Sequence, residues 1–424
     1  MPTAALFRAV AAATSLGLLA VLFRRPDLLY LAGPLVLATV VGLLRRPPGR
    51  PQARLMLSTD VPTEGDELSA AVTVLAPGAD VVSVVLAGGR WVAPTSGGPG
   101  GYAVRPTPGE PAEVEVALTV RRWGRHRVGP ALVTALAADG LLRWGPHEVE
   151  SRPLRVLPRS DPFRGASDVP QARGAVGVHR SARPDEGAEL SGIRPFAPGD
   201  RLRRINWRVS LRTDQLHVNA TVAERDAEVV LLLDGRYDAG HSGGIDGRAS
   251  GIDVTVRAAA ALARFYLRLG DRVGLIAQSE RVLTLPSATG RRQLTRLLDA
   301  LLDLHPPSRR GSEPELLDPH GLDPRALVVL LSPMVGRTVY ERAAALFRRG
   351  HPLVVVDTLP ADAAPAEETE WTGLALRLWR LQRATRLHRL AELGVPIVPW
   401  RGEGSLDLVL RDLARAGSAP RVRR

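Results

Sequence analysis

The amino-acid sequence predicts an N-terminal transmembrane helical hairpin, a β-sandwich-like domain and an α/β doubly wound C-terminal domain. Three patterns carry this prediction: two uncharged apolar runs at the start, short alternating or β-branched runs after them, and regular alternation of strand and helix patterns in the second half. The expected divisions are 1–50 for the hairpin, 52–158 for the β-sandwich-like domain, 159–223 for a linker with an arginine- and tryptophan-rich motif, 224–416 for the α/β domain and 417–424 for a basic tail.

The predicted hairpin rests on residues 9–23 and 28–44, which contain no charged side chain. Each run is close to the roughly 17–25 residues that cross a bilayer as a helix. A cleaved signal peptide followed by a buried helix is the alternative, but Arg24 and Arg25 stand where a small-residue cleavage site is expected. We therefore expect a two-pass protein of the cell membrane, with the lipid bilayer as a partner.

Arginine placement predicts the orientation of this hairpin. Two arginines lie in the turn, and more follow the second run. Because arginine-rich flanks tend to stay on the cytoplasmic side, we expect the soluble domains to face the cytoplasm. The arginines compared are Arg24 and Arg25 in the turn and Arg45, Arg46, Arg50 and Arg54 after the second run.

The composition excludes several classes of function. The chain has no cysteine, so disulfide scaffolds, thiolate nucleophiles, iron–sulfur clusters and cysteine-ligated zinc are ruled out. The net charge is +12, and all the basic side chains other than histidine are arginine. With 41 glycines and 35 prolines, this bias is typical of a GC-rich genome, so the basic charge is a weak indication of phosphate binding and we expect no nucleic-acid partner.

Residues 52–158 read as all-β. Alternating or β-branched runs at 67–75, 80–86, 113–121 and 132–137 are separated by turns rich in proline and glycine. The pattern changes after residue 224, where short apolar strands alternate with longer helices, as in a parallel sheet covered on both faces. The expected strands are 227–234, 272–277, 326–332, 353–357 and 396–400, and the expected helices are 252–269, 291–304, 339–349, 371–393 and 405–414.

The segment 191–218 joins these two domains and is dense in arginine, with Phe196 and Trp207 interleaved. Pro198, Gly199 and Asp200 form a turn signature, and an aspartate before a helix can cap it. Three interpretations stay open. Arginine forks could clamp the domains together with Trp207 in the seam, the segment could be a surface for a partner protein, or it could bind single-stranded nucleic acid.

This segment resembles the signature of the domain of unknown function 58 family. Residues 121–130, 139–142 and 270–277 also resemble turns and strands of that family. The positions that match the signature are Gly192, Arg194, Pro198, Gly199, Asp200, Arg203, Ile205, Asn206, Trp207, Ser210, Arg212, Leu216, Val218 and Glu224. Among them, we expect partner docking or interdomain contact from Gly192, Arg194, Pro198, Gly199, Asp200, Arg203, Asn206, Trp207 and Arg212.

The resemblance implies a membrane-anchored β-domain followed by a von Willebrand factor A-like domain. Such bacterial proteins are commonly encoded beside a MoxR-type AAA+ ATPase and other membrane proteins. The resemblance therefore implies a non-enzymatic adaptor or co-chaperone, with a MoxR-type AAA+ ATPase and other membrane proteins of the same assembly as partners.

A von Willebrand factor A-like domain can hold Mg²⁺ through an Asp-x-Ser-x-Ser sequence after its first strand, leaving one position open for a partner's carboxylate. Here the strand ends at Asp234, and Arg236 and Asp238 replace the two serines. A cation at Arg236 would repel a metal, so we expect no cofactor. Asp234 and Asp238 are the weak candidates for a Mg²⁺ site, which would make the chain a metal-dependent adhesion module.

A serine hydrolase is the remote alternative, and we expect no enzymatic activity. Gly240 to Gly244 fit the Gly-x-Ser-x-Gly string, and Ser242, Asp357 and His388 follow in α/β-hydrolase order. The nucleophile elbow, however, must sit directly on the strand end, and Gly240 comes well after Asp234. A P-loop is excluded because the chain has no lysine.

Overall fold

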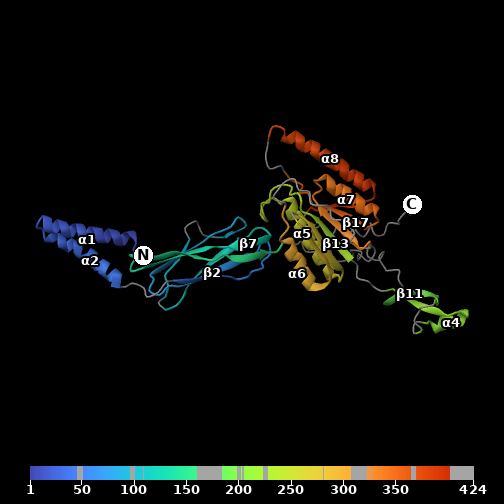
Figure 1. Cartoon of the computed structure of the whole chain (residues 1–424), viewed down its shortest axis with the longest axis horizontal. Coiled ribbons are helices and arrows are strands. Elements are labelled where there is room, and N and C mark those ends of the chain that lie inside the picture. Colours follow the sequence, from blue (N-terminus) through green and yellow to red (C-terminus); the bar gives the residue numbers. More distant parts are fainter. Residues whose placement is uncertain are drawn as a thin grey trace. The chain divides into compact units, whose positions relative to one another are not determined.

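The computed structural model divides the chain into two units, Met1–Pro158 and Arg159–Arg424, which are described separately (Figure 1). The structure describes residues 1–44, 51–95, 101–107, 109–159, 184–197, 202, 205–222, 228–279, 281–306, 322–324, 326–363 and 369–401.

Two apolar helices begin the first unit, α1 (Ala4–Leu22) and α2 (Asp27–Leu44). Both are long and apolar enough to cross a membrane, and only 11% of each is buried within the unit. Apolar side chains around the whole circumference of a helix are typical of a lipid environment. The expected pair of apolar helices is therefore present, while their crossing of a bilayer and their orientation stay predictions.

Two four-stranded antiparallel sheets form the rest of this unit, with strand orders β1-β2-β6-β4 and β5-β3-β8-β9, and β7 pairs with β10. The strands are β1 (Gln52–Leu57), β2 (Glu67–Leu75), β3 (Val81–Leu86), β4 (Val92–Pro94), β5 (Tyr102–Val104), β6 (Ala112–Val120), β7 (Gly124–Val128), β8 (Ala131–Ala137), β9 (Leu142–Val149) and β10 (Arg152–Val156).

The alternation of side chains explains this part of the fold. In β6, Val114, Val116 and Leu118 are buried, while Glu113 and Glu115, which alternate with them, are exposed. The same alternation in β2, β3 and β8 supplies one common apolar core from both sheets. The sequence predicted these four strands, and it missed the shorter or more polar ones around them.

The segment expected to be a linker contains folded elements. An antiparallel pair, β11 (Pro184–Pro195) and β12 (His217–Val222), brackets the short helix α4 (Trp207–Thr213). The matched motif therefore lies partly on a hairpin.

A six-stranded sheet with the order β15-β14-β13-β16-β17-β18 forms the centre of the second unit (Figure 1). Its strands are β13 (Glu228–Asp234), β14 (Arg272–Gln278), β15 (Val282–Ala288), β16 (Leu327–Ser332), β17 (Leu353–Asp357) and β18 (Ile397–Pro399). The helices that accompany it are α5 (Gly251–Arg268), α6 (Gly290–Leu301), α7 (Arg337–Arg348) and α8 (Thr372–Glu392).

Both faces of this sheet are covered. Leu232, Leu330 and Val355 pack in one cluster with residues of α7 and α8. Their neighbours Leu231 and Leu331, which point to the opposite face, are equally buried. Helix α5 contacts β13, β14 and β16. Burial on both faces explains why the sequence of β13 is a continuous apolar run rather than an alternating one.

The expectation of a wholly parallel sheet is wrong at β15, which pairs antiparallel with β14. Only three residues separate the two strands, and a parallel crossover needs a dozen or more. The other neighbours in this sheet pair in parallel. The helix expected at 405–414 lies outside the described residues.

Leu330 tests the central core. We expect Leu330→Ala to lower the free energy of unfolding by about 2–5 kcal/mol, because it removes a fully buried side chain between two helices and the sheet. Leu283→Ala, on the exposed face of β15, should cost less than about 1 kcal/mol. Chemical denaturation of the full chain in detergent, followed by tryptophan fluorescence, measures both. Equal losses would contradict the placement of β16 at the centre.

Candidate functional site

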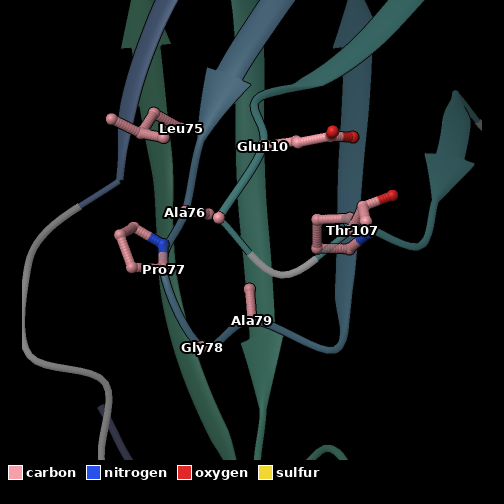
Figure 2. A pocket seen from close by; sticks show the side chains of 9 residues that line it. Leu75, Ala76, Pro77, Gly78, Ala79, Thr107 and Glu110 are labelled. Carbon is pink, nitrogen blue, oxygen red and sulfur yellow. The ribbon is translucent and has the colours of Figure 1, made fainter.

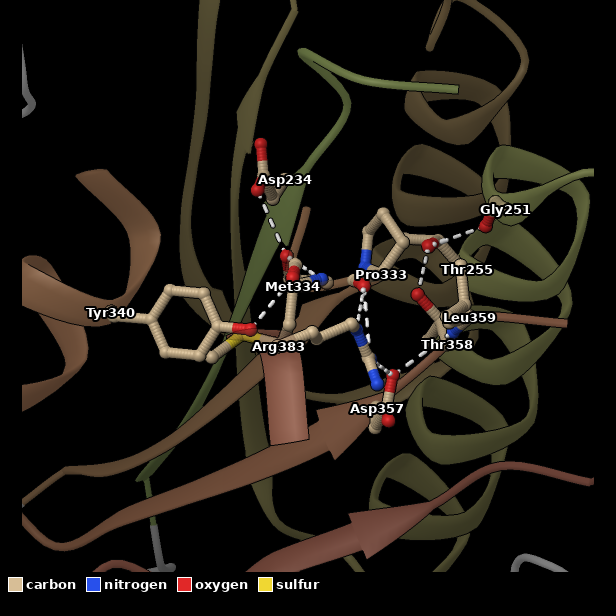
Figure 3. A network of polar contacts seen from close by, with 11 residues as sticks. Asp234, Gly251, Thr255, Pro333, Met334, Tyr340, Asp357, Thr358, Leu359 and Arg383 are labelled. Atoms are coloured by element: carbon tan, nitrogen blue, oxygen red, sulfur yellow. Dashed lines mark hydrogen bonds and ion pairs between the residues drawn. The ribbon is translucent and has the colours of Figure 1, made fainter. Parts of the chain in front are cut away.

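The carboxyl ends of β13, β16 and β17 meet at one edge of the sheet, where they carry Asp234, Ser332 and Asp357 (Figure 3). Ligands of α/β sheets usually bind at this edge. Here Ser332 bonds Asp234, and both aspartates also bond arginines of the chain. Because of its position in the sheet, this edge is the first candidate for a functional site.

Asp234 is buried and forms an ion pair with Arg236. The Nε of Arg236 donates to Oδ1 of Asp234 at 2.9 Å, and both side chains are nearly inaccessible to solvent. Ser332 Oγ donates to the other carboxylate oxygen at 2.8 Å. Arg236 also donates to Thr338 Oγ1 at 2.9 Å, which ties the pair to the start of α7. The carboxylate is thus satisfied on both oxygens by the chain itself.

Gly235 allows this close folding of the loop. Its backbone N–H donates to the Gln278 carbonyl at 2.7 Å. A Cβ at position 235 would lie 2.9 Å from that same oxygen and 2.7 Å from Leu304 Cδ1. A residue with a side chain would push the loop outward, and Arg236 could not then turn back onto Asp234.

A second buried arginine raises the positive charge around this ion pair. Arg342 on α7 is almost completely buried, and burial together with the nearby Arg236 lowers its pKa to about 10, with Asp234 opposing the shift. Arg342 is still protonated at neutral pH at that value. Two arginines and one aspartate leave a net positive charge, so the surroundings of Asp234 disfavour a divalent cation.

Asp238 has a different role from Asp234. Its Oδ1 accepts a hydrogen bond from the Ile252 backbone N–H at 3.0 Å, at the start of α5. Ser250 and Asp253 complete a capping box at the same helix end. Asp238 is thus used to stabilise the start of a helix. Among the described residues there is no group of three or more histidine, aspartate or glutamate side chains arranged to hold a metal ion.

Asp357 forms the second ion pair of the edge, with Arg383 of α8. The Arg383 guanidinium bonds both Asp357 Oδ1 and the carbonyl oxygen of Pro333. The backbone N–H of Leu359 donates to the same carboxylate at 3.1 Å. Figure 3 shows this pair beside the hydroxyl contact between Thr255 and Thr358. Both carboxylates at the strand ends are therefore neutralised by arginines of the chain.

The residues of the hydrolase alternative bond to other groups. Asp357 is paired with Arg383, and His388 lies on the exposed side of α8, 3.3 Å from Glu392. Ser242 Oγ accepts a hydrogen bond from Gly244 N–H at 3.3 Å. Within the part of the chain that the structure describes, Asp357 and His388 are therefore not paired as the orienting acid and base of a triad.

A pocket of about 770 Å³ lies at the carboxyl ends of β17 and β18, beside α8. This volume is typical of small-molecule sites, roughly 300–1,000 Å³. Arginine dominates its charged lining, and both carboxylates there, Asp357 and Asp362, form ion pairs with arginine. The lining favours an anionic group over a cation. Its arginine and tryptophan residues are Arg159, Arg257, Arg380, Arg383, Arg401, Trp379 and Trp400.

A second pocket lies in the β-domain and is much smaller, about 180 Å³ (Figure 2). It is formed by the turn after β2, which includes Pro77 and Gly78, and by the turn that carries Thr107 and Glu110. Its volume is below that of ordinary ligand sites, roughly 300–1,000 Å³. It is a gap between two turns rather than a candidate site.

The arginine and tryptophan motif is partly described. Asn206 caps α4, accepting from the Val209 N–H at 3.2 Å, and its amide donates to Asn219 on β12 at 2.8 Å. Ser210 accepts from the His217 N–H at 2.9 Å. These bonds hold α4 against the hairpin. The conformation of the motif therefore depends on Asn206 and Ser210.

Trp207 and Arg212 lie on the outside of this helix. Trp207 is 61% exposed and Arg212 is exposed. Gly192 and Arg194 pair in β11 with Ala220 and Val218. Pro198, Gly199, Asp200 and Arg203 lie outside the described residues. An interdomain clamp and a partner surface therefore both stay predictions for this motif.

Sequence reasoning missed one feature, the outer side of α8. Leu374, Leu378 and Leu381 are all more than half exposed there. The sequence contains the signal, since apolar residues occupy two opposite sides of this helix. Which of the two sides faces the sheet became clear only from the structure.

Comparison with known proteins finds one family match, over the motif and much of the second unit. Residues 192–366 match the family described as "Protein of unknown function DUF58". The chain is also 28% identical over 191 residues to uncharacterized proteins of Mycobacterium bovis and of Mycobacterium tuberculosis, an alignment that covers 43% of this chain. The matched part spans 58% of the length of these relatives.

The buried ion pair makes a testable prediction. Arg236→Ala leaves the Asp234 carboxylate buried without its arginine, and we expect it to destabilise the second unit by about 3–5 kcal/mol. Arg337→Ala removes an arginine from the exposed pair with Glu341 and should cost less than about 1 kcal/mol. Chemical denaturation of the full chain measures both, and a small loss in Arg236→Ala would show that Asp234 is not desolvated.

Proposed function

We propose that the chain is a membrane-anchored, non-enzymatic adaptor or co-chaperone that works with a MoxR-type AAA+ ATPase. One observation carries the proposal: Arg236 forms a buried ion pair with Asp234 at the strand end where a related domain would hold Mg²⁺. The strand ends at Asp234 and Ser332 are closed by internal bonds, which supports a role in binding rather than in catalysis. The match of residues 192–366 to the family supports carrying over its implied partners.

The second unit is proposed to be a doubly wound, von Willebrand factor A-like domain. The strand order β15-β14-β13-β16-β17-β18 supports this, since the chain runs outward from β13 first in one direction and then in the other. The antiparallel strand β15 at one edge of the sheet also supports this assignment, and so do the helices that cover both faces of the sheet.

Metal-dependent adhesion is not the mechanism we propose. Magnesium prefers open oxygen ligands in octahedral geometry. Asp234 already bonds Arg236 and Ser332, and Asp238 caps α5. The residues at this strand end therefore do not fit a Mg²⁺ ion, and partner binding is expected to be independent of metal.

The anchoring role follows from α1 and α2, which are long and apolar enough to cross a membrane. We propose that both cross it and that the arginines after α2 hold the soluble units on the cytoplasmic side. An AAA+ ATPase that binds cytoplasmic ATP could reach both units in that orientation.

An affinity pull-down of the detergent-solubilised full chain from its native membranes, read by mass spectrometry, tests the partnership. We expect a MoxR-type ATPase with the wild-type chain and a clear loss with Trp207→Ala, since Trp207 is an exposed aromatic side chain of the motif. The matched control is Leu269→Ala, an exposed apolar residue on neither α4 nor α8.

Equal recovery of the ATPase by the wild type and both variants would support the adaptor role. It would also indicate that the motif is an interdomain clamp and not the docking surface. Absence of the ATPase with ATP, with ADP and without nucleotide would overturn the proposed partnership.

Magnesium addition gives an independent prediction. We expect the melting temperature of the full chain to be the same in Mg²⁺ and in EDTA, because the Arg236 guanidinium already neutralises Asp234. Differential scanning fluorimetry measures this. A Mg²⁺-dependent rise that Asp234→Ala abolishes would instead establish the metal-dependent adhesion module.

A further inference from the structure

The outer side of α8 carries an exposed apolar stripe. Trp371, at the N-cap of the helix, is 68% exposed, and Leu374, Leu378 and Leu381 are 64, 56 and 67% exposed. Single exposed leucines are ordinary on a protein surface, but a continuous row of large apolar side chains marks an interaction site.

The stripe is not needed to attach α8 to its own domain, because the opposite side of the helix does that. Arg383 bonds Pro333 and Asp357, and Leu390 is buried in the core cluster with α7. Arg386 lies over the ring of Tyr340 on α7, with 5.9 Å between its Cζ and the ring centroid. The helix is therefore apolar on two sides, and only one of them is used by the described residues of the unit.

The spacing of the residues in the stripe indicates that its binding partner is a helix. Residues 371, 374, 378 and 381 are separated by three, four and three positions, which is the spacing of a and d positions in a coiled coil. In that register Arg383 and Leu390 occupy the f position, facing directly away from the stripe, as observed. A seam this narrow matches one partner helix better than a flat lipid surface.

Charge identifies the chemistry of that partner helix. No acidic residue occurs from Trp371 to Ala391. Within α8, the e and g positions are either basic, as at Arg377 and Arg389, or neutral, as at Ala375, Gln382 and Ala384. Arginine also outnumbers the carboxylates in the lining of the pocket on the inner side of α8. A second copy of this chain would bring like charges together, whereas an acidic helix would pair with them.

We propose that the outer side of α8 is a docking surface for an acidic amphipathic helix of another protein, with leucine-like residues at its a and d positions and glutamate or aspartate beside them. The inference deepens the proposed binding role and rests on it. The stripe lies beyond residue 366, outside the part of the chain that matches the family.

Fluorescence anisotropy with a designed peptide tests the inference. The probe is a labelled peptide, about four heptads long, with leucine at a and d and glutamate at e and g. A second peptide with lysine at e and g is the charge control. The protein is the full chain in phosphatidylcholine nanodiscs. The variants are the double substitution Leu378→Glu/Leu381→Glu and the single substitution Arg377→Glu. Leu269→Glu is the matched control, because Leu269 is as exposed as Leu378 but lies at the end of α5.

We expect the glutamate peptide to bind about tenfold or more tightly than the lysine peptide, and the double substitution to weaken its binding by at least about tenfold. Arg377→Glu should reduce the difference in affinity between the glutamate and lysine peptides. Leu269→Glu should bind both peptides as the wild type does. Circular dichroism shows whether each variant is folded.

Two results would overturn the inference. Equal binding by the wild type and the double variant would show that the stripe is not used. Tighter binding of phosphatidylglycerol vesicles than of the glutamate peptide, lost in the double variant, would assign the stripe to a lipid surface. Peptide binding without recovery of a MoxR-type ATPase would contradict only the named partner. Recovery of the ATPase without peptide binding would contradict only the docking surface.

Discussion

A negative charge buried at the end of β13 constrains everything around it. Asp234 sits where three parallel strands end, and a carboxylate removed from water must be neutralised and hydrogen-bonded. Arg236 and Ser332 do this, and the requirement accounts for the close turn at Gly235 and for the position of α7, which supplies Thr338. Many α/β proteins bind ligands at this edge, but here the chain's own side chains occupy the strand ends at Asp234 and Ser332.

Much of the second unit could be predicted from its sequence, because strands buried on both faces read as uninterrupted apolar runs. β17 was predicted with its observed bounds, and β14 and β16 within one residue. β15 was missed because most of its side chains are exposed, so burial leaves no clear pattern in its sequence. Arg236 was recognised as a cation unfavourable to metal, but its bond to Asp234 depends on loop geometry, which residue spacing does not determine.

The motif and α8 show two different limits of sequence reasoning. In the motif, residue types indicated recognition, while the bonds that shape its described part come from Asn206 and Ser210. In α8, the apolar periodicity predicted a helix correctly, yet a helix with two apolar sides fits a sheet in two ways. The arginines decide between them: Arg383 can reach Asp357 only when the Leu378 side of the helix faces outward.

The bonds of the Arg383 guanidinium restrain the movement of α8 on the sheet. A helix packed through leucines alone can slide along its axis or roll by part of a turn, since such contacts are non-directional. Arg383 is planar and bonds two points on different elements, the Pro333 carbonyl after β16 and the Asp357 carboxylate ending β17. Two directional bonds from one guanidinium oppose both the slide and the roll. The outer side of α8 therefore keeps one orientation relative to the sheet. A partner can bind it without prior reorganisation of the helix.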